Sequence, residues 1–415
     1  MTAERQVRVA RLINGAACIA GAAAAVPSAY VALLTSVAAG KPRTRAHHSS
    51  GSTRFVVCMP AHNEATVIER SVGALYAQRY PSSMFSVHVV ADNCTDGTVH
   101  VAARAGATVH ERIDPQNPGK GPALNWLATE LAEIDFDVLV VIDADTVADP
   151  GFLAAIDGAI ASGASAAQGF YGVEDPHGST AVGLRFAAIA CRHHLRPLAR
   201  NALGASSGLY GNGMAFRTDV LHGRRWSNHL IEDAEFQIEL LLDGHLVAYV
   251  PDAMLRAEMP ETLDGSRSQN ERWELGRIQI ARQFLPILIL RAVTGRRQPR
   301  RVYVDAIADI VSPPLSVQAL LDLTAVALAT GAVMVRPNRQ NRVLLCSGLV
   351  SSAALVAHVL VALRLVGAPP EVYRSLRSAP RAVIWKVMLL TRIARRPDSV
   401  TWTRTPRNAD EGNTQ

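Results

Sequence analysis

The stretch Asp137–Asp145, with the sequence DVLVVIDAD, decides the fold of this chain. Its middle is a continuous apolar run rich in β-branched residues, which is typical of a parallel strand covered on both faces. Asp143 and Asp145 follow where this strand leaves the sheet, and residues i and i+2 of an extended chain point the same way. Two such acids could hold a hard divalent cation, and through it a diphosphate. They could instead be acidic residues that precede and cap a helix beginning at Asp149-Pro150.

Apolar strands and helical segments alternate before this stretch. We expect strands at 55–59, 86–91 and 108–111, and helices at 65–78 and 98–105. Another helix should follow Gly119-Lys120-Gly121 and run to Leu131. Alternation of this kind predicts βαβ units, and therefore an α/β fold with a mostly parallel sheet flanked by helices. The carboxyl ends of parallel strands meet at one edge, and three successive strands end in polar clusters: Glu64, Asp92 with Asp96, and Asp143 with Asp145.

The sequence lacks two common nucleotide-binding motifs at these strand ends. No GxGxxG follows the first strand, which argues against a dinucleotide fold. In Gly119-Lys120-Gly121 the residue after Gly-Lys is neither Ser nor Thr, which argues against a Walker-type loop. Lys120 can still pair with a phosphate as a point charge.

Three hydrophobic segments flank this region. Residues 12–40 carry no charge and can span a bilayer, although a cleaved signal peptide is the alternative. A second span covers 343–363, and a third covers 310–335 with Asp322 near its middle. A membrane carboxylate is costly, so Asp322 should face other helices or water. Alternatively, the span begins after Ser312-Pro313-Pro314, and Asp322 then lies near one interface.

Composition points to a membrane rather than to nucleic acid. The chain has 415 residues, 49% hydrophobic, and a formal net charge of +6. Its Lys and Arg cluster beside the hydrophobic segments, which favours an anionic lipid surface. The five cysteines are scattered without a CxxC pair, which fits a reducing compartment. More basic residues flank the spans on the inside if 41–310 is cytoplasmic. We therefore expect a plasma-membrane protein whose α/β domain is cytoplasmic.

The ordered motifs resemble those of family 2 glycosyltransferases, in particular the membrane synthases for cellulose, chitin and hyaluronan. The donor half is carried by PAHNE at 60–64, ADNCTD at 91–96, GKG at 119–121 with ALN at 123–125, and DAD at 143–145. The acceptor half is carried by GNG at 211–213, IED at 231–233 and a QxxRW pattern at 269–273. Related patterns occur in ceramide glucosyltransferases. Two features depart from the family: three spans are fewer than in most polymer-exporting members, and Ile231 stands where Thr is common.

The resemblance implies a GT-A-like fold and a role for each motif. The base and ribose of a nucleotide-sugar would be framed by Pro60, Ala61, Glu64 and Asp92. Lys120 would meet the diphosphate, Asp143 would support the sugar or the metal, and Asp145 would bind Mg²⁺ or Mn²⁺. Asp233 would be the general base for the acceptor hydroxyl, so that one displacement inverts the anomeric carbon. The acceptor and diphosphate side would be lined by Gly211, Asn212, Gly213, Glu232, Gln269, Arg272 and Trp273.

Several of these residues have a plainer interpretation. Glu64 could be a charge at a helix start, and Glu232 and Asp233 could be helix-cap acids. The glycines around Asn212 could form only a turn. Trp273 could be an interfacial anchor, since Trp is common at membrane surfaces.

These features predict a membrane-bound inverting glycosyltransferase. It would move a sugar from a UDP-linked hexose or N-acetylhexosamine to a polysaccharide or lipid acceptor, with no role for nucleic acid. The alternative is a membrane transporter or sensor whose α/β domain binds nucleotide without transferring sugar. We expect five parts along the chain: an anchor at 1–40, a catalytic domain at 54–273, an interfacial amphipathic helix at 274–301, two transmembrane helices within 302–365, and an interfacial or cytosolic tail at 366–415.

Overall fold

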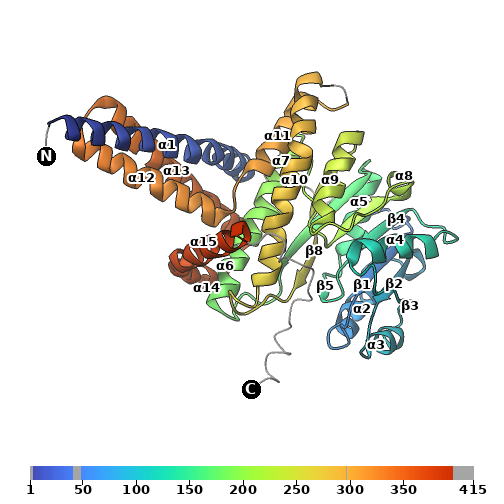
Figure 1. Ribbon diagram of the computed structural model, residues 1–415. Coiled ribbons are helices and arrows are strands. Elements are labelled where there is room, and N and C mark those ends of the chain that lie inside the picture. Colours follow the sequence, from blue (N-terminus) through green and yellow to red (C-terminus); the bar gives the residue numbers. More distant parts are fainter. Residues whose placement is uncertain (1–2, 41–47, 296, 396–415) are drawn as a thin grey trace, which may run out of the picture.

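One mixed sheet of eight strands forms the centre of the computed structural model, which describes residues 3–40, 48–295 and 297–395 (Figure 1). The strand order is β3-β2-β1-β4-β7-β6-β8-β5. Strand β4 (Val138–Val141) is buried throughout. It pairs in parallel with β1 (Phe55–Ala61), β1 with β2 (Phe85–Asp92), and β2 with β3 (Thr108–Arg112). The predicted parallel half of the sheet is therefore confirmed.

The other half of the sheet contains antiparallel pairs that the sequence did not predict. Strand β7 (Met214–Arg217) runs antiparallel to both β4 and β6 (Ala166–Val173). Strand β8 (Val247–Ala257) is parallel to β6 and antiparallel to β5 (Thr146–Ala148). Because Met214 pairs with Val141, the start of β7 meets the end of β4. The GNG loop and the DAD loop therefore share one edge.

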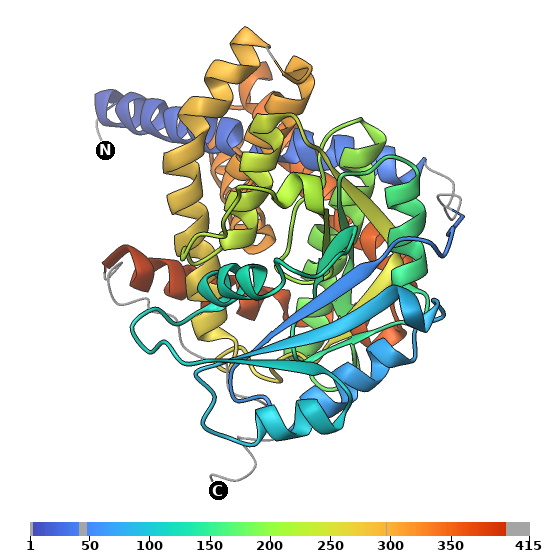
Figure 2. The same cartoon turned by 90° about the vertical axis from the view of Figure 1, so that its right-hand side faces the viewer.

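Helices cover both faces of the sheet, as Figure 2 shows for α4 on one side of β1–β3 and α2 and α3 on the other. One buried apolar cluster joins the sheet to α2 (Ile68–Tyr76), α3 (Thr98–Arg104) and α5 (Phe152–Ala161). A second cluster, on the opposite face, contains residues of α4 (Lys120–Glu130) and α9 (Glu232–Asp243). A short 3₁₀ turn, η1 (Ser82–Met84), precedes β2, and the short α8 (Thr218–Leu221) follows β7. Burial on both faces explains why β4 is apolar along its whole length.

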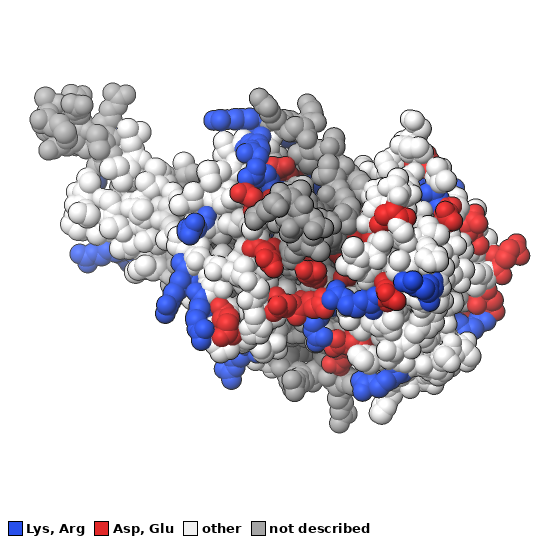
Figure 3. All heavy atoms as spheres, turned by 90° about the horizontal axis from the view of Figure 1, so that it is seen from below, with Lys and Arg blue, Asp and Glu red and all other residues white. Residues whose placement is uncertain are grey.

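Within the described residues, three helices are long and apolar enough to cross a membrane. They are α1 (Ala3–Ala39), α12 (Leu315–Val335) and α13 (Arg339–Leu365), and they pack side by side in Figure 1. Figure 3 shows few charged side chains on the visible face of this bundle. The three predicted spans are therefore confirmed as candidate spans, and the third begins only after Pro314.

Asp322 faces a neighbouring helix within the bundle. Its side chain is buried, and its Oδ1 accepts hydrogen bonds from the Ser28 hydroxyl of α1 at 3.3 Å and from Gln318 Nε2 at 2.9 Å. The expectation that this carboxylate faces other helices is therefore confirmed, although the span also begins late. A polar contact between two spans fixes how the helices pack.

A group of helices lies between the bundle and the sheet (Figure 1). They are α6 (Thr180–Ile189), the π-helical turn η2 (Ala190–Leu195), α7 (Arg196–Ala202), α10 (Arg267–Thr294), α11 (Arg300–Val311), α14 (Pro370–Ser375), the 3₁₀ turn η3 (Leu376–Ser378) and α15 (Ala379–Arg395). The QxxRW residues lie on the first turns of α10, because this helix begins before the predicted start at Glu274. The predicted tail beyond 395 lies outside the described residues.

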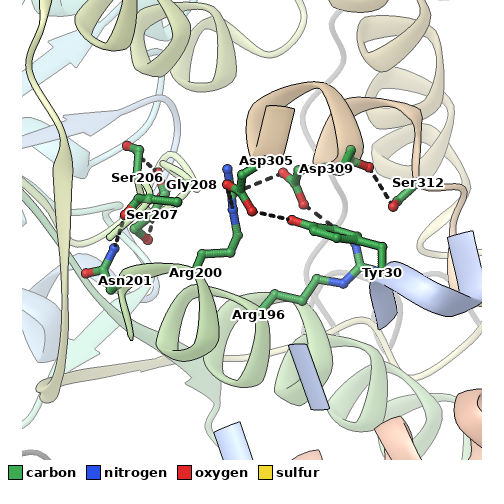
Figure 4. A network of polar contacts seen from close by, with 12 residues as sticks. Tyr30, Arg196, Arg200, Asn201, Ser206, Ser207, Gly208, Asp305, Asp309 and Ser312 are labelled. Atoms are coloured by element: carbon green, nitrogen blue, oxygen red, sulfur yellow. Dashed lines mark hydrogen bonds and ion pairs between the residues drawn. The ribbon is translucent and has the colours of Figure 1, made fainter. Parts of the chain in front are cut away.

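A buried polar network fastens α1 to the domain (Figure 4). Arg200 of α7 donates to Asp305 of α11 at 2.8 Å and to Asp309 at 3.2 Å. The Tyr30 hydroxyl of α1 donates to the other oxygen of Asp305 at 2.8 Å. The buried guanidinium of Arg200 is thus paired with two carboxylates, as a buried charge requires.

Candidate active site

The DAD loop lies between β4 and β5 and is held in place by the GNG loop. Asn212 is completely buried, and its amide donates to the Thr146 hydroxyl at 2.7 Å. Its Oδ1 accepts from the backbone N–H of Asp143 at 3.2 Å. Asn212 therefore positions the acids of the DAD loop. The acceptor contact predicted for Asn212 stays a prediction.

Lys120, the first residue of α4, lies at the centre of the site. Its Nζ donates to the carboxylate of Asp143 and, at 2.5 Å, to the carbonyl oxygen of Gly211. Burial lowers the pKa of Lys120, but the charges of Asp143, Glu232 and Asp233 outweigh this effect and raise it. Lys120 is therefore a positively charged ammonium group that interacts with the carboxylates of Asp143, Glu232 and Asp233.

Gly211 allows these groups to come close together. Its φ of +75° lies in the left-handed region that favours glycine. A Cβ at this position would lie 3.4 Å from Asp233 Oδ2 and 3.7 Å from Lys120 Nζ. The GNG loop therefore brings its backbone directly against the predicted general base.

Glu232 and Asp233 form the first turn of α9. Asp233 Oδ1 accepts from the backbone N–H of Ala234 at 2.8 Å, which leaves Oδ2 on the side of Gly211 and Lys120. Burial and the neighbouring Asp233 charge raise the pKa of Glu232. Burial also raises the pKa of Asp233, against the Ala234 N–H, Lys120 and Arg192. The pair thus combines a helix-start position with a proton affinity suited to acid–base work.

The QxxRW residues approach from α10. Burial lowers the pKa of Arg272, and the charges of Glu232 and Asp143 oppose this effect. Its Nε has no hydrogen-bond partner among the described residues. A planar guanidinium in this position can bind a phosphate group of a ligand.

Arg185 of α6 is a site residue that sequence analysis missed. It donates to Gln269 Oε1 at 2.5 Å, and its guanidinium carbon lies 5.5 Å from the centre of the Trp273 ring. Both contacts join α6 to α10, so only the fold brings these residues together. No motif in the sequence marks Arg185.

The predicted nucleotide-binding residues lie at neighbouring strand ends. Pro60 and Ala61 end β1, and Glu64 is buried in the turn before α2, where its N–H donates to Thr98 Oγ1 at 2.8 Å. Asp92 ends β2 and its carboxylate accepts from Arg112 at 2.5 Å and from the Gly119 N–H at 3.2 Å. Arg112, at the end of β3, is a second residue that sequence analysis missed.

The two acids of the DAD loop would supply only part of the ligands of a metal ion. Among the described residues, no group of three or more His, Cys, Asp or Glu could hold a metal ion. Asp145 Oδ1 accepts from the Thr146 hydroxyl at 3.2 Å, and Asp143 is bound to Lys120. The carboxylate oxygens fit Mg²⁺ or Mn²⁺, whose remaining ligands would be waters and diphosphate oxygens.

Comparison with known proteins agrees with this arrangement. Residues 53–276, more than half of the chain, match the family described as glycosyltransferase like family 2. The chain belongs to this family. It is 23% identical to the probable glucomannan 4-beta-mannosyltransferase 9 of Oryza sativa subsp. japonica, over 55% of this chain and 46% of that protein. It is 25% identical to the probable glycosyltransferase YdaM of Bacillus subtilis (strain 168), over 55% and 56%. The chain thus spans about half the length of these relatives.

A solved structure shares the fold of this glycosyltransferase family member. The mannosyltransferase PcManGT from Pyrobaculum calidifontis, solved in complex with GDP-Man and Mn²⁺, aligns with a TM-score of 0.54 at 20% identity. The alignment covers 85% of this chain and 99% of that one. The predicted GT-A-like fold is therefore confirmed.

Proposed function

We propose that this chain transfers a sugar from a nucleotide-sugar to an acceptor at the membrane. The observation that carries the proposal is that Lys120, Asp143 and Asp233 meet at one sheet edge, with Arg272 close by. Membership of the family supports sugar transfer. We propose a UDP-linked hexose or N-acetylhexosamine as donor, and the mannosyltransferase relatives make GDP-mannose the competing donor to test.

The donor would lie along the ends of β1, β2 and β4. Its base and ribose would be framed by Pro60, Ala61, Glu64 and Asp92. Asp145, with support from Asp143, would hold Mg²⁺ or Mn²⁺, which when bound would supply positive charge to the departing diphosphate. Lys120 would add a protein charge on the same diphosphate.

The chemistry follows from the position of Asp233. The acceptor hydroxyl oxygen attacks the anomeric carbon while the bond from that carbon to the diphosphate oxygen breaks. Asp233 takes the hydroxyl proton, and Lys120 stabilises its negative charge before the reaction. A single displacement inverts the anomeric centre. Gly211 and Trp273 would contact the acceptor, which is either a growing polysaccharide or a lipid.

One experiment tests the proposal and its alternative. The purified protein, in lipid nanodiscs with Mg²⁺ or Mn²⁺, is incubated with a panel of UDP- and GDP-sugars and membrane lipids, and nucleotide release is measured. We expect release with one donor and its loss in Asp233→Asn. Tight donor binding with no release under any condition would favour a nucleotide-binding sensor or transporter.

The pH dependence should distinguish Asp233 from Glu232 as the base. Burial and the Asp233 charge raise the pKa of Glu232 to about 7, so Glu232 is partly protonated at neutral pH. A base works only when it is deprotonated. If Asp233 is the base, kcat/KM therefore stays high as Glu232 becomes neutral and falls only through the pKa of Asp233. Glu232→Gln should keep this acidic limb. An acidic limb near 7 that disappears in Glu232→Gln would identify Glu232 as the base.

The proposed topology places the catalytic domain in the cytoplasm at the plasma membrane. In a variant with Cys18→Ser and Cys346→Ser, Glu133→Cys introduces an exposed thiol on the domain. A thiol reagent that cannot cross membranes should miss it in intact cells and label it after permeabilisation. Arg336→Cys, in the exposed turn between α12 and α13, is the positive control. Labelling of the Glu133→Cys variant in intact cells, beyond that of the same protein without this substitution, would reverse the topology.

A further inference from the structure

Buried arginines in this protein are generally paired with carboxylates. Arg200 binds Asp305 and Asp309, and Arg112 binds Asp92 and Asp114. Arg185, Arg192 and Arg272 are half-buried, and none of the ion pairs in the described part of the chain involves them. The buried Nε of Arg272 has no hydrogen-bond partner among the described residues, and Arg185 donates to the neutral side chains of Gln269 and Met259. These guanidinium groups therefore have donors that an anionic ligand could use.

The three arginines lie on two neighbouring helical segments. Arg185 belongs to α6 and Arg192 to the π-helical turn η2. Arg272 is on α10, and the contact of Arg185 with Gln269 joins the two segments. The charge of Arg192 reaches Asp233 and opposes the rise of its pKa. We call Arg185, Arg192 and Arg272 the arginine cradle.

The position of Arg192 is fixed by the surrounding aromatic side chains. His193 stacks between Tyr171 and Tyr210, with ring centres 5.4 and 4.1 Å apart. The Tyr210 hydroxyl donates to the backbone carbonyl of Arg192 at 2.9 Å. Such π-helical turns occur often at functional sites. The backbone that carries this guanidinium is therefore held in place before a ligand arrives.

The opposite face of the same helical segment packs on the membrane bundle. Ala190, Leu195 and Ala199 belong to one buried apolar cluster with Leu34 of α1 and Ala362 of α13. The segment that carries Arg185 and Arg192 therefore packs against the ends of the candidate membrane spans. A lipid headgroup at the membrane surface would be next to it.

We propose that the arginine cradle binds an anionic group of the phosphate class that the acceptor carries beside its reacting hydroxyl. The proposal rests on the proposed function and specifies its acceptor. The acceptor would be an anionic lipid, or a lipid-linked sugar, whose phosphate occupies the cradle while its hydroxyl reaches Asp233. Guanidinium groups bind phosphate in a bidentate manner, which suits this task better than a single ammonium.

Three probes separate the chemical features of such an acceptor. Phosphatidylglycerol carries a lipid, a phosphate and hydroxyls; diacylglycerol carries a lipid and a hydroxyl; glycerol 3-phosphate carries a phosphate and hydroxyls without lipid. Each is tested for binding to the full-length protein, the lipids in nanodiscs with a phosphatidylcholine background and glycerol 3-phosphate by calorimetry. Arg185→Gln and Arg192→Gln are compared with wild type, and Arg217→Gln, an exposed arginine paired with Asp219, is the matched control.

We expect phosphatidylglycerol to bind more tightly than diacylglycerol, and each cradle variant to weaken it by roughly tenfold or more, as for a lost charged hydrogen bond. Arg192→Lys should restore part of the affinity, and Arg217→Gln should have no effect. Equally tight binding of glycerol 3-phosphate, sensitive to the same variants, would support the phosphate site and show that its source is soluble. Equal binding of phosphatidylglycerol and diacylglycerol, or no loss in either Gln variant, would overturn the proposal.

A measurement of donor binding shows whether a negative result concerns the arginine cradle or the proposed function on which it rests. Nucleotide-sugar affinity is measured on the same samples. Normal donor binding and turnover without a phosphate preference would defeat only the arginine cradle. Failure of wild type to bind or turn over any nucleotide-sugar would defeat the proposed function, whatever the lipids do.

Discussion

Asp233→Asn should reduce turnover by about two to four orders of magnitude, the usual range for a lost acid–base group. The amide keeps the shape of the side chain but cannot take the acceptor proton. The donor-binding residues lie on other strand ends, so donor affinity should stay close to that of wild type. The measurement is paired: nucleotide-sugar affinity by calorimetry and nucleotide release by a coupled assay.

Two controls make this result specific. Asp219→Asn changes an exposed acid paired with Arg217 and should leave turnover unchanged. Trp273→Ala should impair use of the acceptor or product length while slow hydrolysis of the donor by water continues. Near-normal sugar transfer by Asp233→Asn would mean that Asp233 is a structural acid at the start of α9.

Asp145→Asn should weaken donor binding while the protein stays folded. If Asp145 holds the metal, its loss removes a direct ligand. We expect a larger effect than the roughly 10- to 100-fold that changes to outer partners cost in metal sites. Excess chelator should abolish turnover of wild type, and added Mg²⁺ or Mn²⁺ should restore it. The measurement is donor affinity with and without metal, beside thermal unfolding.

The matched control for this variant is Asp135→Asn, whose side chain is 81% exposed and pairs with Arg54 at the far end of β4. It should bind the donor and the metal as wild type does. Full turnover of wild type in excess chelator would contradict the assignment of a metal to the DAD loop. Unchanged donor affinity in Asp145→Asn would contradict its role as ligand.

Local patterns were enough for the parallel half of the sheet. Four consecutive apolar residues in β4 have no polar face to expose, so this strand had to be covered on both sides. Helix starts were less accurate. The helix predicted from residue 65 begins at Ile68, because the chain first forms a turn in which the carbonyl of Glu64 accepts from Val67 and Ile68.

The antiparallel insertion of β7 could not be read from the sequence. Its four residues look like any short apolar strand, and its direction depends on pairing with β4 and β6. That direction places Asn212 under the DAD loop and Gly211 against Asp233. The sequence identified both residues by resemblance and assigned them to the acceptor, whereas the positioning role of Asn212 depends on strand order.

The sequence by itself determined the α/β class, the three apolar spans and the motif residues, because hydrophobic periodicity and residue chemistry are local properties of the chain. Only the tertiary structure decided which charges neutralise one another. Lys120 at the start of α4 forms an ion pair with Asp143 at the end of β4, and Arg200 of α7 forms one with Asp305 of α11. Arg185 of α6 donates a hydrogen bond to Gln269 of α10. Contacts between residues so far apart in sequence arise from packing of whole elements, and no local pattern encodes them.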